Sequence, residues 1–208
     1  MLTVLYKDEH VIVAKKPAGL LSEGEGKDCL PTLLREAAKL DAIYPVHRLD
    51  RDTEGIIVYA LTQKAAAALS RDIADGKWEK VYIALLWGSP KAESGRLCDL
   101  LYYDRKKSKS FVVKGERKGV KQAILDYSVI GRPDESRTAV RIELKTGRTH
   151  QIRVQFASRG LSLCGDRRYG APKESGDTLA LCSAELRFLH PITKEKLEFR
   201  ITPSNFSL

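Results

Sequence analysis

The apolar run over residues 56–61 sets the tightest limit on how this chain can fold. Its six residues carry no charge and follow a polar segment. A short continuous apolar run of this kind is typical of a strand that is buried on both faces. A helix is predicted directly after it, because Thr62 can cap a helical segment that continues to about Asp75 and ends at Gly76. The fold must therefore bury this strand and place a helix beside it.

The other segments mix strands and helices without regular alternation. Strands are predicted over residues 2–14 (two short strands around a charged turn), 81–87, 123–130, 138–144 and 178–201 (joined by a turn at 191–194). Helices are predicted over residues 31–40 and from Thr149, as the N-cap, to about Gly160. Such a mixture favours an α+β fold over a doubly wound sheet. A single domain is the simplest organisation.

The charge balance is basic. Lys and Arg number 36 against 27 Asp and Glu, which gives a formal net charge of +9. This excess attracts polyanions, but charge alone leaves nucleic-acid binding and ordinary basicity equally open. Residues 105–121 hold one acid and eight basic residues, which either contact phosphates or belong to a solvated, mobile hairpin. A second basic patch surrounds Tyr169: Arg167, Arg168 and Lys173.

The four cysteines are far apart and form no Cys-x-x-Cys pair, which argues against a zinc knuckle or a redox motif. They are expected to be reduced, mostly buried thiols. Charges at residues 7–9 interrupt any apolar run of a signal peptide, and no apolar stretch approaches the ~20 residues of a membrane span. We therefore expect a cytoplasmic protein without a membrane partner.

The segment 47–55, HRLDRDTEG, is the most informative part of the chain for chemistry. In it the carboxylate of Asp50 is flanked by Arg48 and Arg51, in a loop that leads into the buried strand. Neighbouring positive charge keeps an acid ionised, and a rigid strand fixes its position, as chemistry at a sugar requires. From the residues alone, a surface ion pair or a turn residue explains the same pattern.

Five further landmarks follow a fixed order with this segment: KKPAGL at 15–20, EKVYIA at 79–84, GRTHQIR at 147–153, Gly165-Asp166 with Tyr169-Gly170, and Leu189-His190-Pro191. Together the six resemble the motifs of the RluA-like family of pseudouridine synthases and span nearly the whole chain. The resemblance implies one pseudouridine synthase catalytic domain over residues 1–208. Its fold is expected to be α+β, with a mixed, largely antiparallel β-sheet, flanking helices and a central RNA-binding catalytic cleft.

The resemblance also implies the activity: an isomerase that converts a specific uridine in structured ribosomal or transfer RNA to pseudouridine. No cofactor and no metal is expected, and His47 and His150 are assigned neither metal binding nor general-base chemistry. The chain begins almost directly on the catalytic fold, which leaves no room for the S4 RNA-binding domain of many relatives. RNA is the expected partner, and a monomer is the expected state.

Three residues match the family's catalytic positions. Asp50 would be the essential carboxylate, and the sequence leaves open whether it attacks the ribose C1′ or abstracts a ribose proton. Tyr82 would stack on the base and help to remove the C5 proton; the alternative is a core aromatic residue. Arg153 would pair with the catalytic acid and hold it charged and oriented; the alternative is a solvated helix charge.

The expected RNA contacts begin with Arg48, which resembles the residue that replaces the flipped base in the RNA stack. The other members of the expected RNA-binding set are Arg51, Arg148, His150, Arg167 and Arg168. Two positions depart from the family pattern: Gln155 stands where a histidine is usual, and Ala184 stands near a position that is usually bulky or aromatic. We expect these changes to affect packing or substrate contacts more than the chemistry.

Two other functions remain open on the sequence. An RNA-binding or RNA-folding chaperone could keep the fold without needing the activity. A glycosylase could use Asp50 hydrolytically and would release free uracil.

Overall fold

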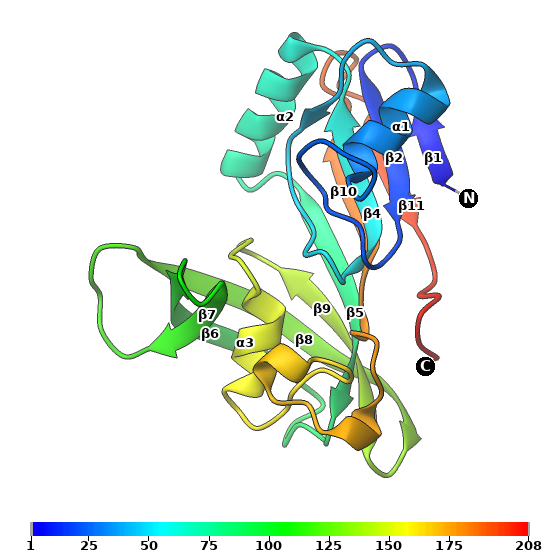
Figure 1. Cartoon of the computed structure of the whole chain (residues 1–208). Helices are drawn as coiled ribbons and strands as arrows, with labels where there is room; N and C mark the ends of the chain where they lie inside the picture. Colours follow the sequence, from blue (N-terminus) through cyan, green and yellow to red (C-terminus); the bar gives the residue numbers. More distant parts are fainter. Residues whose placement is uncertain (1, 208) are drawn as a thin grey trace. The chain divides into compact units, whose positions relative to one another are not determined.

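A computed structural model describes residues 2–207 and divides the chain into two compact units (Figure 1). Unit 1 comprises residues 2–80 together with Cys182–Pro203, and unit 2 comprises Val81–Leu181 together with the described residues from Ser204 onward. The helices α1 and α2 belong to unit 1, and α3 belongs to unit 2. The predicted single catalytic domain over residues 1–208 stays a prediction.

Unit 1 is built on a mixed sheet with the strand order β1-β2-β4-β10-β11. Strand β10 runs parallel to β4, and the other neighbours are antiparallel; β3 also pairs with β4. The elements are β1 (Thr3–Lys7), β2 (Val11–Lys16), α1 (Leu30–Ala38), β3 (Tyr44–Pro45), β4 (Glu54–Ala60), α2 (Gln63–Ala74), β10 (Leu181–Leu189) and β11 (Lys196–Arg200).

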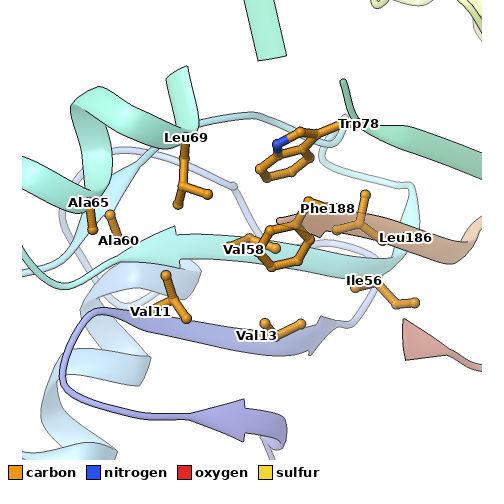
Figure 2. Packing of buried hydrophobic residues seen from close by; sticks show 10 residues of the cluster. All are labelled: Val11, Val13, Ile56, Val58, Ala60, Ala65, Leu69, Trp78, Leu186 and Phe188. Atoms are coloured by element: carbon orange, nitrogen blue, oxygen red, sulfur yellow. The ribbon is translucent and has the colours of Figure 1, made fainter. Parts of the chain in front are cut away.

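One core cluster of unit 1 lies between helix α2 and the sheet (Figure 2). Every residue of β4 is buried, as the apolar run predicts. Helix α2 begins where expected, because the Thr62 side chain accepts a hydrogen bond from the backbone N–H of Ala65 at 3.2 Å. The packed side chains are Val11, Val13, Ile56, Val58, Ala60, Ala65, Leu69, Trp78, Leu186 and Phe188.

Unit 2 holds the strand order β5-β9-β8-β6-β7, in which β7, β6, β8 and β9 pair antiparallel. The elements are β5 (Glu79–Trp87), β6 (Ser94–Asp104), β7 (Lys109–Val113), β8 (Val120–Asp134), β9 (Arg137–Leu144), α3 (Gln151–Ala157) and the 3-10 turns Arg167–Tyr169 and Lys173–Ser175. Strands β6 and β7 form a hairpin whose turn carries Arg105, Lys106 and Lys107. One core cluster of unit 2 contains Leu101, Ala123, Val154 and Tyr169.

The predicted fold class is confirmed: the sheet is mixed and mostly antiparallel, and three helices accompany it in residues 2–207. One predicted feature is wrong. Thr149 does not cap α3, because the N-cap is His150, which adopts a left-handed conformation with φ +53°. The strands β6, β7 and β3 were not expected as such. Over the described range, no helix combines the length and apolarity that crossing a membrane requires.

Candidate active site

Asp50 lies in the loop between β3 and β4, and the residue before it is fixed by a buried serine. The hydroxyl of Ser22 accepts a hydrogen bond from the Leu49 N–H at 3.0 Å and donates one to the Leu49 carbonyl at 2.7 Å. The Ser22 carbonyl accepts in turn from the hydroxyl of Tyr59, a fully buried residue of β4, at 2.8 Å. The backbone on the amino side of Asp50 is therefore attached to the core strand.

The residue after Asp50 is Arg51, and it is held by Lys16 and Gly19. The Arg51 carbonyl accepts hydrogen bonds from the Gly19 N–H at 2.9 Å and from the Lys16 ammonium at 2.7 Å. The Arg51 side chain donates from Nε to the Gly19 carbonyl at 2.9 Å. Both neighbours of Asp50 are thus anchored to residues 16–22, so the half-buried carboxylate starts from a fixed backbone.

Lys16, the last residue of β2, holds this loop, and the sequence reasoning did not single it out for a role. It is fully buried, and its ammonium donates to the carbonyls of Pro17 at 3.0 Å, Leu20 at 2.7 Å and Arg51 at 2.7 Å. Burial lowers the pKa of Lys16 to about 8, and the nearby carboxylates of Asp52 and Asp50 oppose that shift. The pair Lys15-Lys16, directly after the apolar segment VIVA, was the available signal.

Two other polar side chains of the segment, those of Arg48 and His47, have described partners. Arg48 is exposed and pairs with Glu23 at 2.9 Å. His47 accepts a hydrogen bond at Nε2 from the Val58 N–H at 2.9 Å, and its ring lies edge-on to Trp78. Burial, with the Lys80 charge as a smaller cause, lowers the pKa of His47 to about 3. A neutral imidazole that accepts a backbone bond is a structural part of the loop.

In unit 2, Arg153 is a buried residue of α3, so a solvated helix charge is the wrong description of it. Its Nε and Nη2 donate to the two carboxylate oxygens of Asp166 at 2.7 and 2.8 Å. Asp166 is buried as well, so the pair is a bidentate ion pair shielded from water. Asp166 is a second residue that sequence reasoning missed; the Gly-Asp landmark was its only signal.

The other residues that the sequence analysis singled out have the following places in the structure. Tyr82 is a buried residue of β5. Arg148 donates from Nε to the Gln122 carbonyl at 2.9 Å, and Arg167 donates to the Asp177 carboxylate at 2.8 Å. Gln155, the first departure from the family pattern, is fully buried and donates to Asp99 at 2.7 Å. The second departure, Ala184, is buried within β10 of unit 1.

The structure joins the two basic patches of unit 2, which the sequence places about fifty residues apart. Lys109 donates to the Arg168 carbonyl at 2.6 Å, and Arg168 donates back to the Ser108 carbonyl at 3.0 Å. Aromatic rings lie under the cations, with Arg117 over Tyr102 at 4.8 Å. Beside them an open hollow of about 520 Å³ is lined by Leu100, Glu116, Arg117, Val120 and Gln122. Positive charge and aromatic rings together suit a nucleic-acid surface.

A model of the RNA pseudouridylate synthase family matches residues 10–158, which contain Asp50, Tyr82 and Arg153. The chain belongs to this family. It is therefore an isomerase that converts uridine in RNA to pseudouridine, and the resemblance of the six landmarks is confirmed.

Two relatives of this pseudouridine synthase match it over nearly their full length. The dual-specificity RNA pseudouridine synthase RluA of Yersinia pestis is 34% identical over 210 residues, which cover 96% of this chain and 98% of the relative. The protein of the same name from Pasteurella multocida is 32% identical over 214 residues, covering 98% and 94%. The solved human RNA Pseudouridylate Synthase Domain Containing 1 shares the fold, with a TM-score of 0.82 at 22% identity over 100% of this chain and 85% of that one.

Proposed function

We propose that this pseudouridine synthase acts on a uridine in ribosomal or transfer RNA and that Asp50 is its catalytic carboxylate. The observation that carries the assignment of Asp50 is the anchoring of both its neighbours, Leu49 through Ser22 and Arg51 through Lys16 and Gly19. A carboxylate that must meet a sugar carbon at bonding distance benefits from a backbone that does not have to be ordered during the reaction.

The chemistry needs one carboxylate and no external reactant. Asp50 either attacks C1′ or removes a ribose proton, and either route breaks the N1–C1′ bond. The uracil then turns and is joined again through C5. As this bond forms, the bond from Asp50 to C1′ breaks or the ribose proton returns to the sugar; the C5 proton is lost while N1 gains one, so the product is an isomer of the substrate and Asp50 is regenerated. An anion suits this path because the sugar develops positive charge as the bond breaks.

Tyr82 and Arg153 are proposed as the other two members of the active site. Tyr82 would stack on the uracil and assist loss of the C5 proton. Arg153 would hold the catalytic carboxylate ionised and oriented. The buried bidentate pair with Asp166 supports this role, because it presents a guanidinium in a fixed plane rather than on a flexible stem.

The basic surface of unit 2 is proposed to contact RNA phosphates through the turn at 105–108 and Arg168. Arg48, Arg51, Arg148, His150 and Arg167 complete the proposed RNA-binding set. Such contacts supply affinity and salt dependence, whereas the uridine itself must be unstacked at a cost of a few kcal/mol. A uridine in an RNA loop is the favoured target, since its base is already partly exposed.

The ribosomal part of this choice is supported by the name of one relative. Besides the dual-specificity enzymes, a protein of Zymomonas mobilis named ribosomal large subunit pseudouridine synthase D is 33% identical over 218 residues. With such substrates the enzyme would work in the cytoplasm, and we propose that it does so as a monomer. Size-exclusion chromatography with light scattering tests the monomer directly.

The test compares Asp50→Asn with Asp52→Asn, which removes a carboxylate two residues away in the same loop. Tritium release from C5-labelled uridine in total RNA should vanish for Asp50→Asn and persist for the control, and the wild type should release no free uracil. Mapping pseudouridine in cellular RNA with and without the gene then names the site. Free uracil would favour a glycosylase. A cellular phenotype that Asp50→Asn rescues fully would favour an RNA chaperone.

A further inference from the structure

Tyr169 is a buried residue whose ring lies against two cations of unit 2. The guanidinium carbon of Arg153 lies over the ring at 5.2 Å from its centroid, and the ammonium of Lys109 lies over it at 4.8 Å. The negative face of an aromatic ring attracts both groups, and the attraction is stronger where water is excluded. The orientation of this ring therefore affects where the Arg153 guanidinium can rest.

The hydroxyl of Tyr169 fixes that orientation. It accepts a hydrogen bond from the backbone N–H of Ser110 in β7 at 2.9 Å and lies 2.9 Å from Nδ1 of His150. The Ser110 side chain also donates to the Thr149 carbonyl at 2.6 Å. The ring is thus attached both to the basic hairpin and to the start of α3, the helix that carries Arg153.

Arg153 is consequently held in two ways. Asp166 binds one edge of the guanidinium through two hydrogen bonds, at Nε and Nη2. The Tyr169 ring lies against the same group, with the guanidinium carbon 5.2 Å from the ring centroid. The two-bond pair sets the plane of the guanidinium, and contact with a ring that is itself anchored adds a second restraint on the same group.

We propose that Tyr169 is a positioning residue for the reaction, acting through Arg153, and that its hydroxyl does this by anchoring the ring to Ser110 and His150. The inference rests on the proposed role of Arg153. The Ser110 backbone that holds the hydroxyl belongs to the hairpin. The hairpin would therefore help to position Tyr169, in addition to its proposed phosphate contacts.

Tyr169→Phe tests the proposal, since it keeps the ring and removes only the anchor. A small misplacement of a catalytic group is costly, so we expect kcat to fall about tenfold. The KM for RNA should change less than about twofold, because Lys109 and Arg168 remain. Tyr127→Phe is the matched control: it also removes a tyrosine hydroxyl from unit 2, but this hydroxyl bonds only to the Ala92 carbonyl, at 3.4 Å, among the described contacts. It should keep the wild-type kcat.

A double-variant cycle with Arg153→Lys separates positioning from a general loss of stability. If Tyr169 acts through Arg153, adding Tyr169→Phe to Arg153→Lys should lower kcat no further. An equal fall in both backgrounds would overturn the inference. So would a wild-type kcat in Tyr169→Phe beside an impaired Arg153→Lys. A wild-type kcat in Arg153→Lys would instead overturn the proposed role of Arg153, and all variants are compared well below their melting temperatures.

Discussion

The ammonium of Lys16 donates a hydrogen bond of 2.7 Å to the backbone carbonyl of Arg51, 35 residues further along the chain. This bond joins the end of β2 to the residue that follows Asp50. The donor is fully buried and is shared with the carbonyls of Pro17 and Leu20. A single buried side chain therefore links the core of unit 1 to the backbone of the candidate catalytic loop.

Replacing Lys16 by Met should destabilise the protein at neutral pH, because three carbonyls lose their common donor. Unsatisfied buried groups cost ~1–3 kcal/mol each, and the Arg51 carbonyl keeps its bond from the Gly19 N–H, so we expect a loss of about 2–4 kcal/mol. Urea unfolding measures it. An exposed lysine of unit 2, Lys91, supplies the control, and Lys91→Met should stay within ~0.5 kcal/mol of the wild type.

The same lysine predicts a pH dependence. Its pKa is about 8 in the folded protein, against an ordinary lysine pKa of 10.5 in the unfolded chain. Between these values the unfolded chain binds more protons, so the unfolding free energy should rise with pH through this window. Relative to Lys16→Met, the wild type should gain up to about 3 kcal/mol between pH 8 and pH 10.5. Parallel curves for the two proteins would contradict the prediction.

His47 predicts a loss of stability at acid pH. Its folded pKa of about 3 lies below the ordinary histidine pKa of 6.5, so stability present above pH 6.5 is lost as the pH falls toward 3. His47→Gln can still accept the Val58 hydrogen bond but cannot ionise. Between about pH 7 and pH 5, the wild type should lose about 1–2 kcal/mol more than the variant in chemical unfolding. Equal losses would show that the imidazole is protonated without penalty.

Gly55 cannot accept a side chain, because a Cβ there would lie 2.5 Å from both the N and the O of Ser183. Its φ of +131° also lies in the region that favours glycine. Gly55→Ala should therefore separate β4 from β10 and cost more than ~3 kcal/mol in unfolding free energy. Gly131→Ala, where nothing lies within 4 Å, should cost less than ~1 kcal/mol. Similar losses at both sites would argue against the close approach.

The basic turn of the hairpin predicts the salt dependence of RNA binding. Neutralising Arg105 and Lys106 with glutamine should weaken binding to all RNA sequences alike. The slope of log Kd against log salt should fall by about 0.7–0.9 for each phosphate that is no longer neutralised. Filter binding over a range of salt concentrations measures both quantities. Lys91→Gln removes a charge elsewhere in unit 2 and should leave the slope unchanged; if it lowers the slope as much, the effect is one of net charge.

The local signals of the sequence predicted the elements of unit 1 well. The apolar run at 56–61 is the buried strand β4, and Thr62 caps α2 as expected. Such signals work because a continuous apolar strand and a capped helix are decided by residues a few positions apart. The landmarks likewise located the family, because each combines several residues at fixed spacing.

Long-range contacts were beyond that reasoning. The bonds from Ser110 to Tyr169 span 59 residues, and no local pattern indicates them. His150 replaces Thr149 as the N-cap of α3, in a left-handed conformation that propensity disfavours. Tyr169 lies within hydrogen-bonding distance of its ring, which stabilises that geometry from outside the helix. The basic run contains β7, which pairs with β6, a strand that lies upstream of the run.

The division of the chain also has a consequence for biosynthesis. Unit 1 is interrupted in sequence by unit 2, and β4 is completed by β10 only after the ribosome has made about 120 further residues. Until then, Leu186 and Phe188 cannot pack on the apolar residues that they contact in the finished core. We expect nascent chains that stop at residue 181 to be cut by protease within residues 2–80, and release of the finished chain to protect them. Strand β10 thus completes the sheet beside β4, the strand that follows the loop carrying Asp50, only late in synthesis.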